Sequence, residues 1–119
     1  MTYVDGFVVP VKIKKIKAYE KIAKAARKIW IEHGALDYKE CLLEDAKKFD
    51  HCINFPTLAK PKKNETLVFA FIVYKNRAHR DKVNAKVMKD KRMHELCDPK
   101  NMPFDCARTA YSGFKTIVE

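Results

Sequence analysis

The nine residues Thr66–Tyr74, with the sequence TLVFAFIVY, constrain the fold more than any other stretch of the chain. Every position from Leu67 to Tyr74 is apolar or aromatic, so both faces of an extended strand here are apolar. β-Branched and aromatic residues also favour strands. The stretch therefore predicts a strand in the middle of a sheet.

Three other segments have the composition of strands. Tyr3–Val11 is rich in β-branched and aromatic residues, and both of its faces are largely apolar. Ala35–Leu43 alternates less regularly, and Arg108–Val118 contains Gly113, which indicates a bulge or a close approach of another chain segment. These segments predict three further strands around the central one.

Two segments have helical patterns. Lys14–Glu32 carries one apolar stripe at steps of three and four, and Gly34 after it suits the left-handed residue that closes a helix. The stripe consists of Ile16, Tyr19, Ile22, Ala23, Ala26, Ile29 and Trp30. Asn76 is a suitable N-cap for a second helix over about 77–90. Residues 44–65 are harder to assign, and we expect a packed segment, with a short strand as one alternative, before a turn at 60–65.

The order strand, helix, strand, strand, helix, strand predicts one α+β domain over residues 1–119. Two right-handed βαβ units interleave into a ferredoxin-like βαββαβ fold with a four-stranded antiparallel sheet and both helices on one face. The other face then stays uncovered although the strands are apolar on both sides. We therefore expect a homodimer in which two subunits pack sheet to sheet.

Composition limits the classes of partner. The formal charge of +10 comes from lysines spread along the chain without one dense block, so we expect weak nucleic-acid binding at most. No apolar run approaches the roughly 18 residues of a membrane span, and no membrane partner is expected. The first residues lack the pattern of a signal peptide, which favours the cytoplasm.

No motif predicts a metal or a cofactor. Cys41, Cys52, Cys97 and Cys106 form no CxxC pair, and we interpret them as ordinary small hydrophobic residues. The three glycines are too scattered for a phosphate-binding loop, and no Gly-x-Ser-x-Gly nucleophile motif occurs. The four histidines are better explained as surface or helix-end residues than as haem ligands.

Five polar residues stand on or beside strands that should be buried on both faces: Asp5, Glu40, Asp105, Arg108 and Tyr111. Buried charge is costly unless it is paired or lies in a wet cavity. The first interpretation is structural, with an Asp105–Arg108 pair that holds the turn into the last strand and a hydrogen-bonded Asp5 at a sheet end. The alternative is a ligand-facing cluster in a cleft lined by the sheet.

The chain resembles the DUF1428 family of small, mostly bacterial proteins. The resemblance is carried by Tyr3–Phe7, His33–Leu36, Glu40–Cys41, Val68–Phe69, Arg80–Asp81, Asn84, Asp90–Met93, Met102–Asp105, Arg108 and Tyr111–Phe114. It departs at Ser112, where the family often has glycine, and at Leu42, where an aromatic residue is common. The family is similar to the dimeric α+β barrel proteins, which implies two ferredoxin-like subunits packed sheet to sheet.

The resemblance brings no established reaction and no catalytic residues, so the function is unknown at this point and whether the protein is an enzyme stays open. The leading hypothesis is a homodimer that binds a small molecule or has a non-catalytic role. The alternative is an enzyme, such as a cofactor-free monooxygenase or an isomerase, that acts on a small apolar substrate in the barrel. A nucleic-acid-binding accessory protein is the third hypothesis.

Overall fold

A computed structural model describes all residues from Met1 to Glu119. The main elements, in chain order, are β1 (Tyr3–Lys12), α1 (Ile16–Glu32), β2 (Asp37–Leu42), α2 (Phe55–Ala59), β3 (Glu65–Tyr74), α3 (Arg77–Met88), α4 (Lys91–Leu96) and β4 (Ala110–Lys115). Short 3₁₀ turns precede α1 and β4, at Ile13–Lys15 and Cys106–Arg108. No helix is long and apolar enough to cross a membrane.

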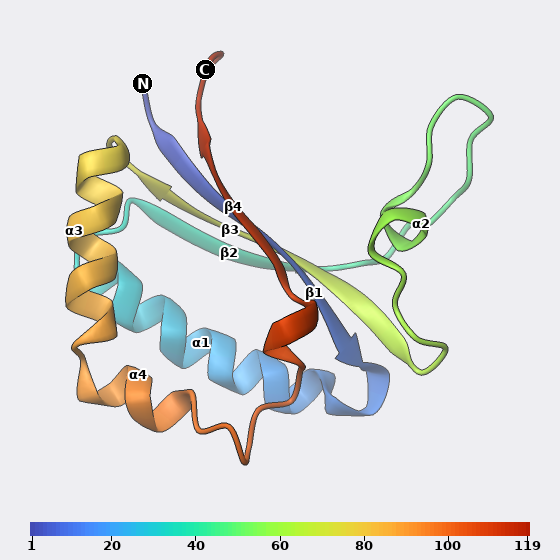
Figure 1. Cartoon of the computed structure of the whole chain (residues 1–119), viewed down its shortest axis with the longest axis horizontal. Coiled ribbons are helices and arrows are strands. Elements are labelled where there is room, and N and C mark those ends of the chain that lie inside the picture. The colour runs from blue at the N-terminus through green and yellow to red at the C-terminus, as the bar shows by residue number, and fades with distance from the viewer.

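The four strands form one antiparallel sheet in the order β2-β3-β1-β4. The predicted central strand, β3, pairs with β1 along its whole length and with β2 on its other side. Helices α1, α3 and α4 lie together on one side of this sheet (Figure 1). The predicted ferredoxin-like α+β fold is therefore confirmed.

The core lies between α1 and the sheet, as the helical stripe predicts. Tyr19, Ala23, Ala26 and Ile29 of α1 are buried, and they face the strand positions that include Val9, Val68 and Ile72. Gly34 has a φ of 115°, the positive value expected of the residue that ends this helix. Gly113 allows the predicted close approach, because a Cβ there would overlap the Tyr3 hydroxyl oxygen.

The second predicted helix, over about 77–90 with Asn76 as its N-cap, corresponds to α3. Two features differ from the prediction. Residues 44–65 contain no additional strand before β3 and instead carry the short helix α2, whose N-cap Asn54 accepts a hydrogen bond from the Thr57 amide. The helix α4, which begins after Asp90 and is capped by its side chain, was not predicted. Met93 of α4 is buried against the core.

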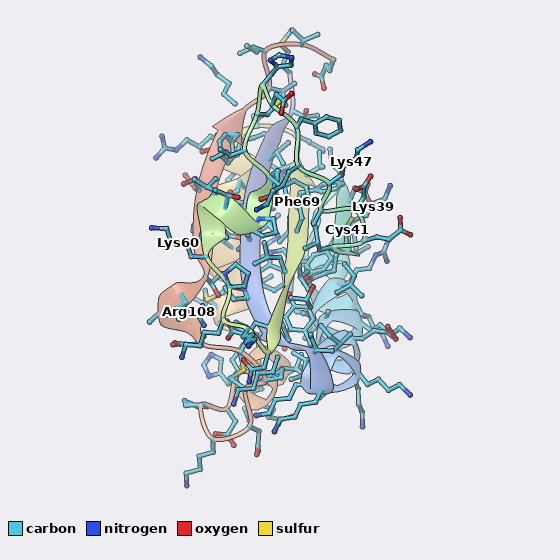
Figure 2. The ribbon with its side chains drawn as sticks, turned by 90° about the vertical axis from the view of Figure 1, so that its right-hand side faces the viewer. Lys39, Cys41, Lys47, Lys60, Phe69 and Arg108 are labelled. Carbon is cyan, nitrogen blue, oxygen red and sulfur yellow. The ribbon has the colours of Figure 1, made fainter.

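The second face of the sheet carries no long helix, and we call it the open face. It consists of Val4, Gly6, Val8 and Pro10 of β1, Asp37, Lys39 and Cys41 of β2, Leu67, Phe69, Phe71 and Val73 of β3, and Ala110, Ser112 and Phe114 of β4. The segment with α2 lies on this side (Figure 1), where Phe55 packs edge-on against Phe69 at 5.9 Å between ring centroids. Figure 2 shows the open face, with Phe69 near its middle and Lys39 and Cys41 along one edge. Phe69 and Phe114 remain 44% and 58% exposed.

Candidate functional site

The structure places the five candidate residues in two regions. Asp5, Glu40 and Tyr111 lie on the helix-covered face of the sheet, where they pair in register with Ile72, Ala70 and Phe7 respectively. Asp105 and Arg108 lie at the 3₁₀ turn before β4. None of the five residues belongs to the open face. Of the five, Glu40 lines a cavity on the helix-covered side of the sheet.

An apolar cavity of about 200 Å³ lies between the helices and the sheet. We call it the internal cavity; it is lined by Phe7, Val9, Ala70 and Ile72 of the sheet, by Tyr19, Ile22, Ala23, Ala26 and Trp30 of α1, by Met93, Leu96 and Cys97 at α4, by Met102, Phe104 and Thr109 of the following segment, and by Tyr38 and Glu40 of β2. Its alanines are the reason for the space, because no large side chain fills the region between α1 and β3.

Glu40 is the one carboxylate on the wall of the internal cavity, and two tyrosines hold it. Its Oε1 accepts a hydrogen bond from the Tyr19 hydroxyl at 2.5 Å, and its Oε2 accepts one from the Tyr38 hydroxyl at 2.7 Å. Burial, the negative charge of Glu40 and these hydrogen bonds raise the pKa of both tyrosines. Both hydroxyls therefore stay protonated and act as donors at neutral pH.

The same three residues form the partition between the internal cavity and an open groove outside it. Tyr19, Tyr38 and Glu40 line both spaces, and the groove runs between α1 and β2. Arg27 lines the groove and donates from Nε to the backbone oxygen of Tyr38 at 3.1 Å, which ties α1 to the edge strand. The carboxylate thus faces apolar space on one side and solvent on the other.

Asp5 lies in a second polar group, below α3. It is 1% exposed, and Nη1 of Arg80 lies 3.1 Å from its Oδ1. Burial raises the pKa of Asp5, and the positive charge of Arg80 partly offsets that effect. Arg80 also donates to the hydroxyls of Tyr111 at 2.6 Å and Tyr3 at 3.3 Å, and its guanidinium lies over the Tyr3 ring. This group connects α3 to the two strands β1 and β4.

The expected Asp105–Arg108 pair is absent, which corrects the first structural interpretation. Asp105 accepts a hydrogen bond from the Ala107 amide and so caps its own 3₁₀ turn. Arg108 reaches instead to the start of β3, where Nη1 lies 2.7 Å from Oε2 of Glu65. The hydrogen bond from Arg108, together with one from the Lys62 amide, lowers the pKa of Glu65 to about 2.

The remaining candidates for chemistry are dispersed. No three His, Cys, Asp or Glu side chains converge closely enough to hold a metal ion, and the four cysteines are free. His33 caps the end of α1, as its position in the last turn predicts, and its Nε2 lies 2.8 Å from Asp90. The internal cavity is therefore the place in the molecule with the geometry of a small-molecule site.

Sequence reasoning identified Glu40 but missed its partners. Tyr19 was assigned to the apolar stripe of the helix, 21 residues from Glu40 along the chain. A signal for Tyr38 was present, since a residue two positions before Glu40 on a strand points to the same face. Arg80 is among the residues that carry the family resemblance, but only the folded chain shows that α3 brings it to Asp5.

Together the fold and the cavity define a ferredoxin-like α+β domain with an apolar site between its helices and its sheet. The chain is similar to a solved structure described as a dimeric ferredoxin-like protein from an uncultured marine organism. The TM-score is 0.55 at 16% sequence identity, over 100% of this chain and 99% of that chain. At this identity the likeness shows the fold alone.

Sequence comparison places the chain in a family. It is 40% identical over 119 residues to proteins called "Uncharacterized protein YbaA" from Escherichia coli (strain K12) and from Shigella flexneri, over 100% of this chain and 99% of each relative. The model of DUF1428, described as a protein of unknown function, matches residues 2–106. The chain belongs to the DUF1428 family, which confirms the resemblance seen in its motifs.

The Asp5–Arg80 pair predicts strong coupling between two substitutions. Arg80→Met leaves the buried Asp5 carboxylate without its cation and is expected to cost about 3–5 kcal/mol. Combined with Asp5→Asn, it should cost less than the sum of the two single changes, because no buried charge is left unpaired. Urea unfolding of the four proteins measures the cycle, and single effects that add within about 0.5 kcal/mol would contradict the coupling.

The Arg108–Glu65 pair predicts a pH-dependent contribution to stability. The folded-state pKa of Glu65 lies below its ordinary value of 4.5. The stabilisation is therefore complete above about pH 4.5 and is lost as the pH falls toward about 2. Glu65→Gln should lower the urea midpoint at about pH 7 and have much less effect at about pH 2. An equal loss at both pH values would show that the charge of Glu65 is not involved.

Proposed function

We propose that this protein is a homodimer that binds a small apolar molecule in the internal cavity of each subunit. The ligand has one or two rings and offers a hydrogen-bond donor to the Glu40 carboxylate. The observation that carries this proposal is the cavity itself, which is partly open and is lined almost entirely by hydrophobic residues between α1 and the sheet.

The size of the space is sufficient for a small ring compound. An apolar cavity of about 150 Å³ is large enough to take up benzene, and this cavity measures about 200 Å³. Because the cavity is partly open, a ligand can enter it, and burial of the ligand's apolar surface against the lining would stabilise the complex.

The wall of the cavity defines the chemistry of the ligand. The rings of Phe7, Trp30 and Phe104 favour an apolar, flat molecule. Glu40 already accepts one hydrogen bond on each oxygen, and an ionised carboxylate has further lone pairs. A ligand N–H or O–H can use one of these, whereas an anionic ligand would meet a like charge in apolar surroundings.

The homodimer is supported by the open face and by the segment that carries α2. Besides Phe69 and Phe114 on the sheet, that segment exposes the large apolar side chains of Phe49, Ile53, Phe55 and Leu58. Figure 2 shows the α2 segment in front of the strands, beside Phe69. A second copy of the same surface provides an apolar partner, and two-fold symmetry allows both faces to be covered at once.

Ligand binding predicts a stabilisation that depends on the volume of the internal cavity. Indole has two fused rings and one N–H donor, and it should raise the melting temperature of the protein. At an indole concentration about 100 times the Kd, the gain is about 2.7 kcal/mol. Ala26→Leu places a larger side chain on the cavity wall and should reduce the indole effect, as measured by thermal shift and by calorimetric titration.

The matched control is Ala25→Leu, since Ala25 is the neighbouring position on α1 and does not line the cavity. This variant should bind indole as the wild-type chain does. Equal binding by both variants would mean that indole binds elsewhere. No binding of indole, phenol or naphthol to the wild-type protein would remove the proposal for this class of ligand.

Dimerisation predicts a mass of about twice the 13.9 kDa chain by light scattering at micromolar concentration. Phe69→Lys places a charge near the middle of the open face and should give a folded monomer. Ala18→Lys on the exposed surface of α1 is the control and should leave the dimer unchanged. A wild-type protein that stays at the monomer mass would rule the homodimer out.

A further inference from the structure

The Glu40 carboxylate has the surroundings of a catalytic base and not only of a ligand-binding group. It is the one carboxylate on the wall of an otherwise largely apolar cavity. Its side chain is partly exposed, because it also lines the groove outside the cavity. A general base must lie within hydrogen-bond reach of the proton that it removes. Its position at the cavity wall brings it within reach of a bound molecule.

Two tyrosines fix the direction of this carboxylate. Tyr38 is 6% exposed and stands two residues before Glu40 on β2, and Tyr19 is 8% exposed on α1. The Tyr19 ring packs edge-on against Phe104 at 5.5 Å, and the Tyr38 ring lies 5.8 Å from that of Trp30. Each carboxylate oxygen is therefore held by a donor that is itself held by packing, which is the arrangement a precise base requires.

The groove outside the partition gives the proton a path to solvent. Glu40 lines both the internal cavity and the groove between α1 and β2. A proton taken from a molecule inside the cavity can leave through the groove without the apolar cavity opening. The buried Asp5 carboxylate is paired with Arg80, whereas Glu40 is held by two tyrosine hydroxyls and has no cation partner among the ion pairs of the chain.

We propose that Glu40 is a general base that removes a proton from carbon in a small apolar ring compound held in the internal cavity. The C–H bond breaks, an O–H bond forms on a Glu40 oxygen, and the electron pair remains on the compound. That pair is delocalised into a neighbouring unsaturated group or expels a leaving group. The proton returns to another carbon in an isomerisation or passes to water in an elimination. This inference rests on the proposed binding function.

The probe is a nitrobenzisoxazole, a two-ring compound that needs only a base to react. Removal of the proton on its ring carbon forms a carbon–nitrogen triple bond as the N–O bond breaks, and oxygen leaves as a coloured phenolate. No oxidant or cofactor takes part. The wild-type protein should accelerate this reaction, and Glu40→Gln should lower kcat/KM by about 100-fold or more.

Two further variants make the test specific. Glu95→Gln removes an exposed carboxylate on α4 and should leave the rate unchanged. Glu40→Asp keeps a carboxylate but shortens the side chain, so its rate should lie between those of wild type and Glu40→Gln. Circular dichroism and melting temperature establish that each variant is folded.

Indole binding separates this inference from the proposed function. If indole stabilises wild type and Glu40→Gln but both proteins react with the probe at equal rates, Glu40 is not a base and the binding function stands. The same conclusion follows if wild type binds indole and shows no reaction. If indole does not bind and the rate does not depend on Glu40, the binding function and the base are both overturned.

Discussion

The pairing of β1 with β3 is the constraint on which the rest of the structure depends. The two strands pair over the whole of Tyr3–Lys12 and Glu65–Tyr74, and each carries one edge strand on its other side. Because both strands are central, α1 covers one face of each strand, and the other face of each strand is part of the open face. The helical crossovers then cover one face only, so the cavity and the uncovered apolar surface are both consequences of this arrangement.

Small residues at facing positions turn one part of the core into a cavity. Ala23 and Ala26 of α1 and Ala70 of β3 line the cavity together with the larger Tyr19, Trp30 and Phe104. The short alanine side chains leave the space next to them unfilled. Tyr19 both lines this space and donates a hydrogen bond to Glu40, so one residue contributes to the shape of the cavity and to its polar group.

The sequence predicted the elements with strong periodicity and failed where structure depends on distant contacts. The strands around Asp5 and Phe69 and the stripe that includes Ala26 were predictable, because a period of two or of 3.6 identifies them. α4 was missed, since six residues with only Met93 buried give no readable stripe. Asn54 followed by Phe-Pro is a helix-start signal, but its helix is too short to show periodicity. For Glu40, alternation could not decide which face α1 covers, because both faces are apolar.

The alternation of side chains along the strands also separates the two proposed roles. On β3, Ala70 and Ile72 line the internal cavity, while Phe69 and Phe71 belong to the open face. On β2, Glu40 faces the cavity and Cys41 the other side. The residues proposed to contact the ligand and those proposed to contact the other subunit therefore alternate along the strand. They lie on opposite faces of the sheet. Since the same β3 backbone fixes both sets, a change in register would exchange the two faces and remove the cavity and the interface together.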